Sequence, residues 1–287
     1  MSVSLNQYAK IYSTFENERT RPVFDLLAPL ATRTTGNAID LGCGPGNSTE
    51  VLQRFFPQAT IAALDSSEDM IEKAQQRLPH VRFDVGSIQD WMPNEHYDLI
   101  LANASLQWVP NHQQLYPHLM QQLSPTGALA VQTPDNLGEP AHELLKELAT
   151  STQWCSQLSA VERLPRANAE WYFELLSAHS SQVTIWRTCY FHHLKGGIDD
   201  VVDWFRGSAL RPYLLQLGER DQVQFLTQYK QMLQDAYRVL DDGSVLLPFP
   251  RLFINALRKP PIKKPLTGLF YWVYSGSRLC SALLTIW

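Results

Sequence analysis

Residues 39–47, Ile-Asp-Leu-Gly-Cys-Gly-Pro-Gly-Asn, decide the fold class of this chain. An apolar run at 38–41 leads into the glycines, and a segment with helical spacing follows at 48–56. Glycine permits positive φ and lets a ligand approach the backbone closely, and the following helix offers free N–H groups to an anion. The stretch therefore predicts a ligand site at the carboxyl end of a parallel strand.

The alternation of strand and helix continues on the C-terminal side of this turn. Buried parallel strands read as short apolar runs that helices separate. Runs of this kind lie at 60–64, 81–85, 99–102 and 128–132, and segments with helical spacing lie at 67–77 and 113–123. The pattern predicts an α/β, Rossmann-like fold, with helices on both faces of a mainly parallel sheet.

The second half of the chain has longer predicted strands, at 183–193 and 244–257. The later strand contains Pro248 and Pro250, which demand an edge position or a break because proline has no N–H to donate. Residues 139–174 are mainly helical. Helices predicted between the two strands, at 198–206 and 219–237, would form a cap over the ligand edge of the sheet.

No linker divides residues 1–257, so we expect a single domain. Its parts are an N-terminal lid at 1–34, a cofactor half at 35–136 and a substrate and cap half at 137–257. The tail at 258–287 opens with the basic stretch RKPPIKKP and continues as an apolar, aromatic segment. Such a tail can pack on the body or on a partner subunit, lie on an anionic membrane surface, or be disordered.

Bulk composition excludes several classes of protein. A formal net charge of -4 provides no basic field for nucleic acid. The four cysteines lie far apart without CxxC or Cys/His spacing, so we expect no metal site. Four widely separated cysteines fit a reducing compartment, and the N-terminus has no apolar signal-peptide core, so we expect a cytoplasmic protein.

Two cofactors fit the glycine turn. Asp65 closes the next strand about twenty residues on, where a carboxylate can accept hydrogen bonds from both ribose hydroxyls. A dinucleotide prefers GxGxxG, whereas the spacing here is GxGxG with Pro45 inserted. Preceded by Asp40, this form resembles the first motif of class I S-adenosylmethionine (SAM)-dependent methyltransferases. A dinucleotide site and a turn that binds nothing remain as alternatives.

Further segments resemble the trans-aconitate 2-methyltransferase family over about residues 7–257. They lie in the cofactor half and in the presumed cap alike: FENERTRP, DLGCGPGNST, ANASLQWVPNH, VQTPDN, WRTCYFHHL, LRPYL and FPRLFINALR. The resemblance implies a class I methyltransferase sheet with one antiparallel strand. It also implies SAM as cofactor, S-adenosylhomocysteine (SAH) as product, and a methyl ester on one carboxylate of trans-aconitate.

The resemblance also assigns the cofactor residues near the turn. Three glycines would line the methionine end: Gly42, Gly44 and Gly46. Asp40 would accept from the methionine amine or an adjacent water, and Asp65 and Ser66 would hold the ribose.

Five residues farther along complete the implied cofactor site. Met70 either packs near the adenine or belongs to the helix core. Asn103 and Ala104 end a strand beside the glycine turn, so their backbone can reach the methionine. Many relatives carry an acidic residue before Ile88 that accepts from the adenine amino group. Ser87 is a weaker acceptor there.

A carboxylate acceptor is ionised at pH 7, so its methylation needs positioning and desolvation but no general base. Arginine suits this task because its fork binds a carboxylate in two contacts. The cationic candidates lie in segments that carry the resemblance: Arg19, Arg21, Arg187, His192, Arg211 and Arg251. The alternative for Arg187, Arg211 and Arg251 is a structural ion pair.

Other candidates have their own alternatives. Strand alternation places Arg187 on the side of His193 and not of His192, unless a bulge intervenes. Arg19 and Arg21 would clamp the cofactor carboxylate, contact the acceptor, or cap a helix. Gln107 and Trp108 follow a strand end, where Trp108 forms either an apolar wall beside the methyl group or part of the core.

The hypothesis is thus a SAM-dependent carboxyl methyltransferase whose partner is a small polycarboxylate, with trans-aconitate as the acceptor. One alternative is another carboxylate, such as an acyl-carrier-linked acid. The other is a SAM-binding scaffold without catalytic activity.

Overall fold

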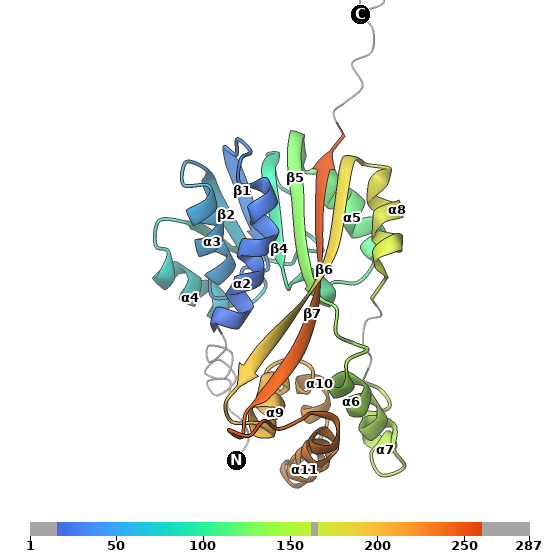
Figure 1. The fold of residues 1–287 in the computed structure, drawn as a ribbon. Coiled ribbons are helices and arrows are strands. Elements are labelled where there is room, and N and C mark those ends of the chain that lie inside the picture. The colour runs from blue at the N-terminus through green and yellow to red at the C-terminus, as the bar shows by residue number, and fades with distance from the viewer. Residues whose placement is uncertain (1–15, 162–165, 260–287) are drawn as a thin grey trace, which may run out of the picture.

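The computed structural model describes residues 16–161 and 166–259, which form two bodies joined by a long two-stranded ribbon (Figure 1). The larger body contains a seven-stranded sheet of order β3-β2-β1-β4-β5-β7-β6. The strands are β1 (Asn37–Leu41), β2 (Thr60–Asp65), β3 (Arg82–Val85), β4 (Tyr97–Asn103), β5 (Leu123–Pro134), β6 (Ser180–Leu194) and β7 (Val245–Arg258). Strand β7 is antiparallel to both of its neighbours, and the pairs from β3 to β5 are parallel. The predicted sheet with one antiparallel strand is confirmed.

Helices cover both faces of this sheet, as the sequence predicted. The covering helices are α2 (Glu16–Leu27), α3 (Asn47–Phe55), α4 (Glu68–Arg77), α5 (His112–Gln121) and α8 (Ala169–Ser177). The central strands are apolar on both sides because each must bury both faces. In β4, Leu99 and Leu101 join the core under α2 and α3. Ile100 and Ala102 point the other way, into the core under α5 and α8.

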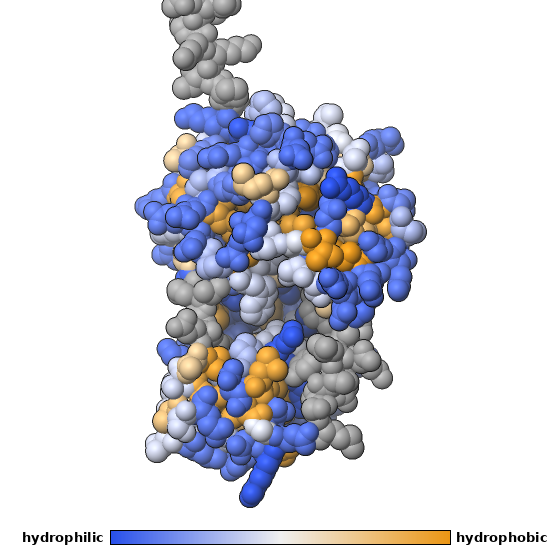
Figure 2. All heavy atoms as spheres, turned by 180° about the vertical axis from the view of Figure 1, so that it is seen from behind, coloured by the Kyte–Doolittle hydropathy of each residue, from blue (hydrophilic) through white to orange (hydrophobic). Residues whose placement is uncertain are grey.

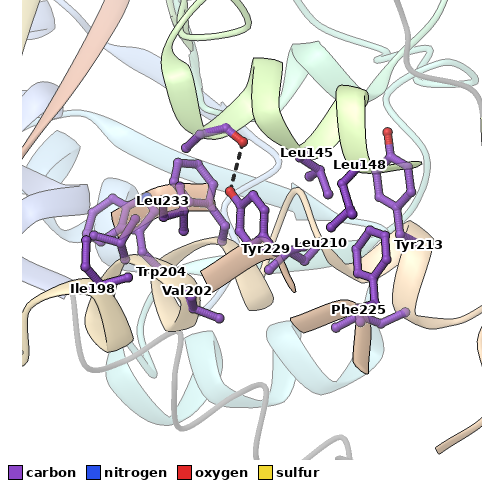
Figure 3. Close-up of a cluster of buried hydrophobic side chains, with 14 of the residues drawn as sticks. Leu145, Leu148, Ile198, Val202, Trp204, Leu210, Tyr213, Phe225, Tyr229 and Leu233 are labelled. Carbon is purple, nitrogen blue, oxygen red and sulfur yellow. Dashed lines mark hydrogen bonds between the residues drawn. The ribbon is translucent and has the colours of Figure 1, made fainter. Parts of the chain in front are cut away.

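The smaller body is a helical cap at the carboxyl edge of the sheet (Figure 1). It contains α6 (Pro140–Thr150), α7 (Cys155–Leu158), α9 (Ile198–Arg206), α10 (Arg211–Leu214) and α11 (Glu219–Ala236). These helices surround a core of their own, part of which is drawn in Figure 3. The hydroxyl of Tyr229 donates to the carbonyl of Ala141 at 2.9 Å, which ties α11 to α6 inside that core. The two predicted cap helices between the last two strands are α9 and α11, and the short α10 between them was not predicted.

Strands β6 and β7 run without interruption from the sheet into the cap. On the ribbon face toward α2, Trp186 stacks on Phe253 at 5.0 Å in the sheet body. At the other end, Leu194 pairs with Val245 and both belong to the cap core. The residue pairs between these two ends lie at the constriction that separates the bodies, which is visible from behind in Figure 2. We call this region the waist.

The two prolines of β7 lie where the strand passes the end of β5. The β5 ladder ends at the pair Pro134–Arg251, and the next residue, Asp135, donates its N–H to the carbonyl of Pro250 at 2.8 Å. Beyond this point the only strand of the described chain that pairs with β7 is β6. Pro248 and Pro250 therefore have the local edge position that the sequence demanded, within a strand that is interior elsewhere.

Two short 3₁₀ helices, η1 (Ala28–Leu30) and η2 (Leu106–Trp108), complete the described elements. Within residues 16–161 and 166–259, no helix is long and apolar enough to cross a membrane. The predicted tail begins one residue later than expected, because Arg258 still belongs to β7. The tail beyond Lys259 and the first half of the predicted lid lie outside the described residues.

Candidate functional site

The glycine turn lies at the carboxyl end of β1, as the sequence predicted. Gly42 has a φ of 76°, and a Cβ there would lie 2.3 Å from the Cβ of Ser105, so no side chain fits. Gly44 has a φ of 54°, but a Cβ there would meet no atom within 4 Å. Gly46 precedes the first residue of α3. Close packing at Gly42 and open space at Gly44 are what a backbone cradle for a ligand requires.

Asp65 ends β2 beside this cradle. Its Oδ2 accepts from the N–H of Gly44 at 2.8 Å, and its Oδ1 accepts from the N–H of Ser67 at 2.9 Å. Each carboxylate oxygen can accept a second hydrogen bond, so Asp65 retains capacity for two hydroxyl donors. Ser66 is exposed beside it. The carboxylate is thus fixed to the turn in a position that fits a ribose.

Asp40 is buried beneath the turn. Its Oδ2 accepts from the hydroxyls of Ser48 at 2.6 Å and Thr49 at 2.7 Å, both in the first turn of α3. Its Oδ1 is buried and has no hydrogen-bond partner among the described residues. Burial, opposed by the two hydroxyl hydrogen bonds, raises the pKa of Asp40 to about 6. A buried carboxylate oxygen that needs a donor fits the amine of a bound amino acid moiety.

The other predicted cofactor residues also follow the carboxyl ends of the strands or lie on α4. Met70 is partly buried. The hydroxyl of Ser87 accepts from the N–H of Gln89 at 3.1 Å, so it supports the local backbone. Ile88 is buried beside Gly42. Ala104 follows Asn103 with a φ of 51°, which is unusual for a residue with a Cβ.

A cationic and aromatic group, which we call the waist cluster, lies on the α2 side of the ribbon. Its members come from α2, β6, α9 and β7: Arg19, Arg21, Tyr190, His192, Trp204, Phe249 and Arg251. The guanidinium carbon of Arg251, whose residue is 3% exposed, lies 4.7 Å from the ring centre of Phe249. That of Arg21 lies 5.5 Å from Tyr190, and that of Arg19 lies 5.2 Å from Trp204. Three arginines therefore converge on aromatic surfaces that favour cations.

His192 occupies the centre of the waist cluster and is 4% exposed. Its ring stacks on Trp204 at 4.4 Å, and its Nε2 has no hydrogen-bond partner among the described residues. The pKa of His192 is lowered to about 3, chiefly by burial and in addition by the positive charges of Arg251, Arg19 and Arg21. His192 is therefore a neutral imidazole throughout the physiological range.

Tyr190 joins the ribbon to α2. Its hydroxyl donates to Asp25 Oδ2 at 2.5 Å, and burial together with Asp25 raises the pKa of Tyr190 well above its usual range. The side chain of Asn255 donates to the carbonyl of Leu26 at 3.2 Å, a second link between β7 and the same helix. These contacts hold Arg19 and Arg21, one to two turns earlier on α2, against the waist.

Three polar side chains, of Asn103, Gln107 and Gln132, lie at the ends of β4 and β5 and in η2, and these two strands separate β1 from β7 in the sheet. Gln132 Oε1 accepts from Arg251 Nη1 at 3.2 Å, and Gln107 Nε2 donates to the carbonyl of Ala104 at 2.7 Å. Gln132 Nε2, Gln107 Oε1 and Asn103 Oδ1 are buried without hydrogen-bond partners in the described part of the chain. Buried polar atoms that lack partners need an explanation, and a polar ligand at this edge would supply the missing hydrogen bonds.

Arg187 does not lie with the other arginines. The β6–β7 register is continuous from Gln182 to Leu194, so no bulge brings Arg187 to the side of His192. Arg187 is on the opposite ribbon face, 57% exposed, with its Nε 2.7 Å from Asp135 Oδ2. Its Nη2 also donates to the carbonyl of Asp135 at 3.2 Å. Pro250, which lies opposite Asp135, has no N–H that could donate to this carbonyl. The ion-pair alternative therefore describes Arg187.

Two further candidates, Trp108 and Arg211, are exposed. Trp108 is 60% exposed in η2, so the alternative of a core tryptophan is wrong. Arg211 begins α10 in the cap and is exposed there. Four residues of this region were not predicted from the sequence: Asp25, Gln132, Tyr190 and Trp204. Only Gln132 carries a local signal, as a polar residue that directly follows a buried apolar run.

Comparisons with known proteins agree with this geometry. The family described as "Methyltransferase domain" matches residues 33–192. Trans-aconitate 2-methyltransferase of Yersinia pestis is 46% identical over 248 residues, which are 86% of this chain and 96% of that protein. The enzyme of the same name from Shigella dysenteriae is 44% identical over the same length. The crystal structure of the YcgJ protein from Bacillus subtilis shares the fold, with a TM-score of 0.55 at 13% identity over 83% of this chain and 99% of that one.

The chain therefore belongs to the methyltransferase family, as a class I enzyme that uses SAM. Within that family its curated relatives at 44–46% identity are trans-aconitate 2-methyltransferases. The alternative of a dinucleotide-binding protein is excluded. The cradle at Gly44, the orphan oxygen of Asp40 and the fixed carboxylate of Asp65 fit the cofactor of this family.

Proposed function

We propose that this enzyme forms a methyl ester on one carboxylate of a small polycarboxylate, and that trans-aconitate is its acceptor. The observation that carries the proposal is the convergence of Arg19, Arg21 and Arg251 around His192 at the same edge as the glycine turn. The names of the relatives at 44–46% identity support the choice of acceptor.

The residues at the glycine turn would hold the cofactor. Asp40 Oδ1 has no partner of its own and would accept from the cofactor amine, Asp65 would accept from its ribose hydroxyls, and the open space at Gly44 would let the cofactor approach the backbone. SAM would supply a methyl group on a sulfonium sulfur: a carboxylate oxygen would bond to the methyl carbon in line as the carbon–sulfur bond breaks, SAH would leave, and no proton would be transferred. The chain's own contribution is then to orient the two reactants and to exclude water.

The ionisation states in the waist cluster favour a carboxylate acceptor over an amine or a phenol. An amine or phenol would need a base that takes up a proton near neutral pH. His192, with a pKa of about 3, is too weak a base, and Tyr190 stays protonated because its pKa is raised. A carboxylate needs no base because it is already ionised.

The waist cluster binds the acceptor's charges in a desolvated setting. Arg251 is buried among the rings of Tyr190 and Phe249, and Arg19 is partly buried against Trp204, so water has limited access to these two guanidinium groups, whereas Arg21 is exposed at the rim. Charge pairs are stronger where water is excluded, so each carboxylate that meets an arginine here is held more firmly than at the surface.

Contact of the tail beyond Lys259 with the body, with a second copy of the chain or with an anionic membrane is a further proposal, as is a cytoplasmic location. Flotation of the full chain with anionic vesicles, compared with a variant that ends at Lys259, tests the membrane contact. Equal flotation of the two would contradict it.

The test of function is methyl transfer from labelled SAM to a panel of acids and one amine. We expect trans-aconitate to be methylated with the highest kcat/KM, dicarboxylates to be methylated less efficiently, and monocarboxylates and the amine to be poor acceptors. An enzyme that binds SAH but methylates no carboxylic acid in the panel would overturn the proposal.

A further inference from the structure

Gln132 lies near the carboxyl end of β5 and is 0% exposed. It shares a strand face with Ala128 and Ala130, which pack in the core under α2. A fully buried amide is costly unless its oxygen and its nitrogen both find partners. If Gln132 served only to pack the core beside these alanines, an apolar side chain would be more stable at this position.

The orientation of this amide follows from its neighbour. Arginine only donates hydrogen bonds, so the atom that faces Arg251 Nη1 at 3.2 Å must be the oxygen of Gln132. The Nε2 group, with two hydrogens to donate, therefore points elsewhere. It is buried and has no acceptor in the described part of the chain.

Gln132 also lies between the two halves of the site. In the sheet it pairs with Asn103 on the cofactor side and with Phe253 of β7 on the other side. Its carbonyl accepts from the N–H of Ala104 at 2.8 Å, in the segment after β4 that carries Gln107. The amide thus adjoins Arg251 of the waist cluster and the strand end nearest the glycine turn.

We propose that Gln132 determines specificity for the reacting carboxylate, which it holds through Nε2 beside Arg251. The inference rests on the proposed function, because it names how that same site orients its acceptor. An amide is suited to this position because it donates to a carboxylate and adds no negative charge of its own. A carboxylate in its place would pair with Arg251 and repel the acceptor.

The experiment compares Gln132→Glu and Gln132→Met with the parent enzyme. Gln182→Glu, an exposed glutamine on β6, is the control for added charge. SAH affinity by calorimetry reports folding and the cofactor half, and we expect it within about twofold of the parent. We expect kcat/KM for trans-aconitate to fall about 10-fold or more in Gln132→Met and about 100-fold or more in Gln132→Glu.

Two readouts separate a contact with the acceptor from a structural role. The first is the ratio of methyl-ester isomers, which we expect both Gln132 variants to change. The second is the affinity for trans-aconitate relative to its monoamides, measured in the presence of SAH. The parent should prefer the carboxylate at the reacting position, and Gln132→Glu should reduce that preference by at least about tenfold, since an amide can donate to the new carboxylate.

The outcomes distinguish the inference from the function on which it rests. If the parent methylates no polycarboxylate, the proposed function and the inference about Gln132 are both overturned. If the parent methylates trans-aconitate and the Gln132 variants keep its efficiency, isomer ratio and preference, the inference alone is overturned. Gln132→Met keeps the test valid if Gln132→Glu does not fold, because it is of similar length and brings no charge into the core.

Discussion

The glycine turn and the waist cluster are built in opposite ways. The turn offers a ligand its backbone and two carboxylates, which come from residues 40–49 and the end of the next strand. The waist cluster consists of side chains from α2, β6, α9 and β7. Its contacts join residues far apart in sequence, such as Asp25 and Tyr190, 165 positions apart. The proposed cofactor site is thus formed by residues close together in the sequence, whereas the proposed acceptor site forms only when the chain is folded.

The largest expected effect separates the two regions. Replacing Arg251 by Met removes a buried charge that would meet the acceptor, at a cost of about 2–4 kcal/mol, or roughly 30- to 1,000-fold in kcat/KM for trans-aconitate. We expect SAH affinity to change less than about twofold, since Arg251 is distant from the glycine turn in the sheet order. Steady-state kinetics measure kcat/KM for trans-aconitate, and calorimetry measures the affinity for SAH. A parallel loss of SAH affinity would mean that the regions are not independent.

Asp65→Ala is the reciprocal test at the glycine turn. It removes a charged acceptor for the ribose and the partner of the Gly44 N–H, and we expect SAH to bind about 10- to 150-fold more weakly, or about 1.5–3 kcal/mol. With SAM at saturation, the acceptor KM should stay close to that of the parent. Unchanged SAH affinity in a folded Asp65→Ala protein would show that Asp65 does not bind the ribose.

The raised pKa of Asp40 gives cofactor binding a pH dependence that acceptor binding lacks. Below about pH 6 the free protein carries a proton on Asp40, and the cofactor amine requires the carboxylate. We therefore expect SAH affinity to be constant above pH 7 and to fall up to about tenfold per pH unit below pH 6. Asp40→Asn should bind SAH weakly with a flatter profile. A parent profile that is flat from pH 5 to 8 would exclude Asp40 as the titrating contact.

Arg187 provides the matched control for Arg251, on the other face of the same ribbon. Its ion pair with Asp135 is largely exposed, and such pairs contribute about 0–1 kcal/mol to stability. We expect Arg187→Met to change kcat/KM for trans-aconitate by less than about threefold and to lower the free energy of unfolding by no more than about 1 kcal/mol. If Arg187→Met lowered kcat/KM for trans-aconitate as much as Arg251→Met does, Arg187 would have to contact the acceptor.

The smallest effect is expected from pH acting on the chemical step. A carboxylate acceptor stays ionised, and His192 stays neutral because its pKa is about 3. The single-turnover rate at saturating SAM should therefore be nearly flat from about pH 6.5 to 8.5. A tenfold rise per pH unit across this range would point to an acceptor that needs a base.

The contrast between the two regions also explains what the sequence could predict. The strand, the glycine turn, Asp40 and Asp65 lie within short windows, and short-range spacing is what hydrophobic periodicity and motifs report. The sequence also flagged Arg251 and His192, through the family resemblance. It could not place Arg187 on the other face with certainty until the β6–β7 register excluded a bulge.

Other parts of the site depend on pairings that no local pattern carries. Gln132 meets Arg251 only because β5 pairs with β7, 119 positions away in sequence. Trp204 reaches His192 because α9 returns from the cap to the ribbon. The structural role of Arg187, at the carbonyl opposite Pro250, follows from the point where β7 passes the end of β5.

The ribbon's two faces restrict how its length can change. Neighbouring residues of a strand point to opposite faces, so inserting one residue between Phe249 and Phe253 would exchange the faces of every residue on one side of the insertion. Arg251 and Phe253 could then no longer both keep their present faces. Either the side chain of Arg251 would leave the waist cluster, or the stack between Trp186 and Phe253 would be lost. An insertion of two residues keeps both faces. Natural variants or designs that lengthen this arm are therefore limited to even steps, made in both strands together.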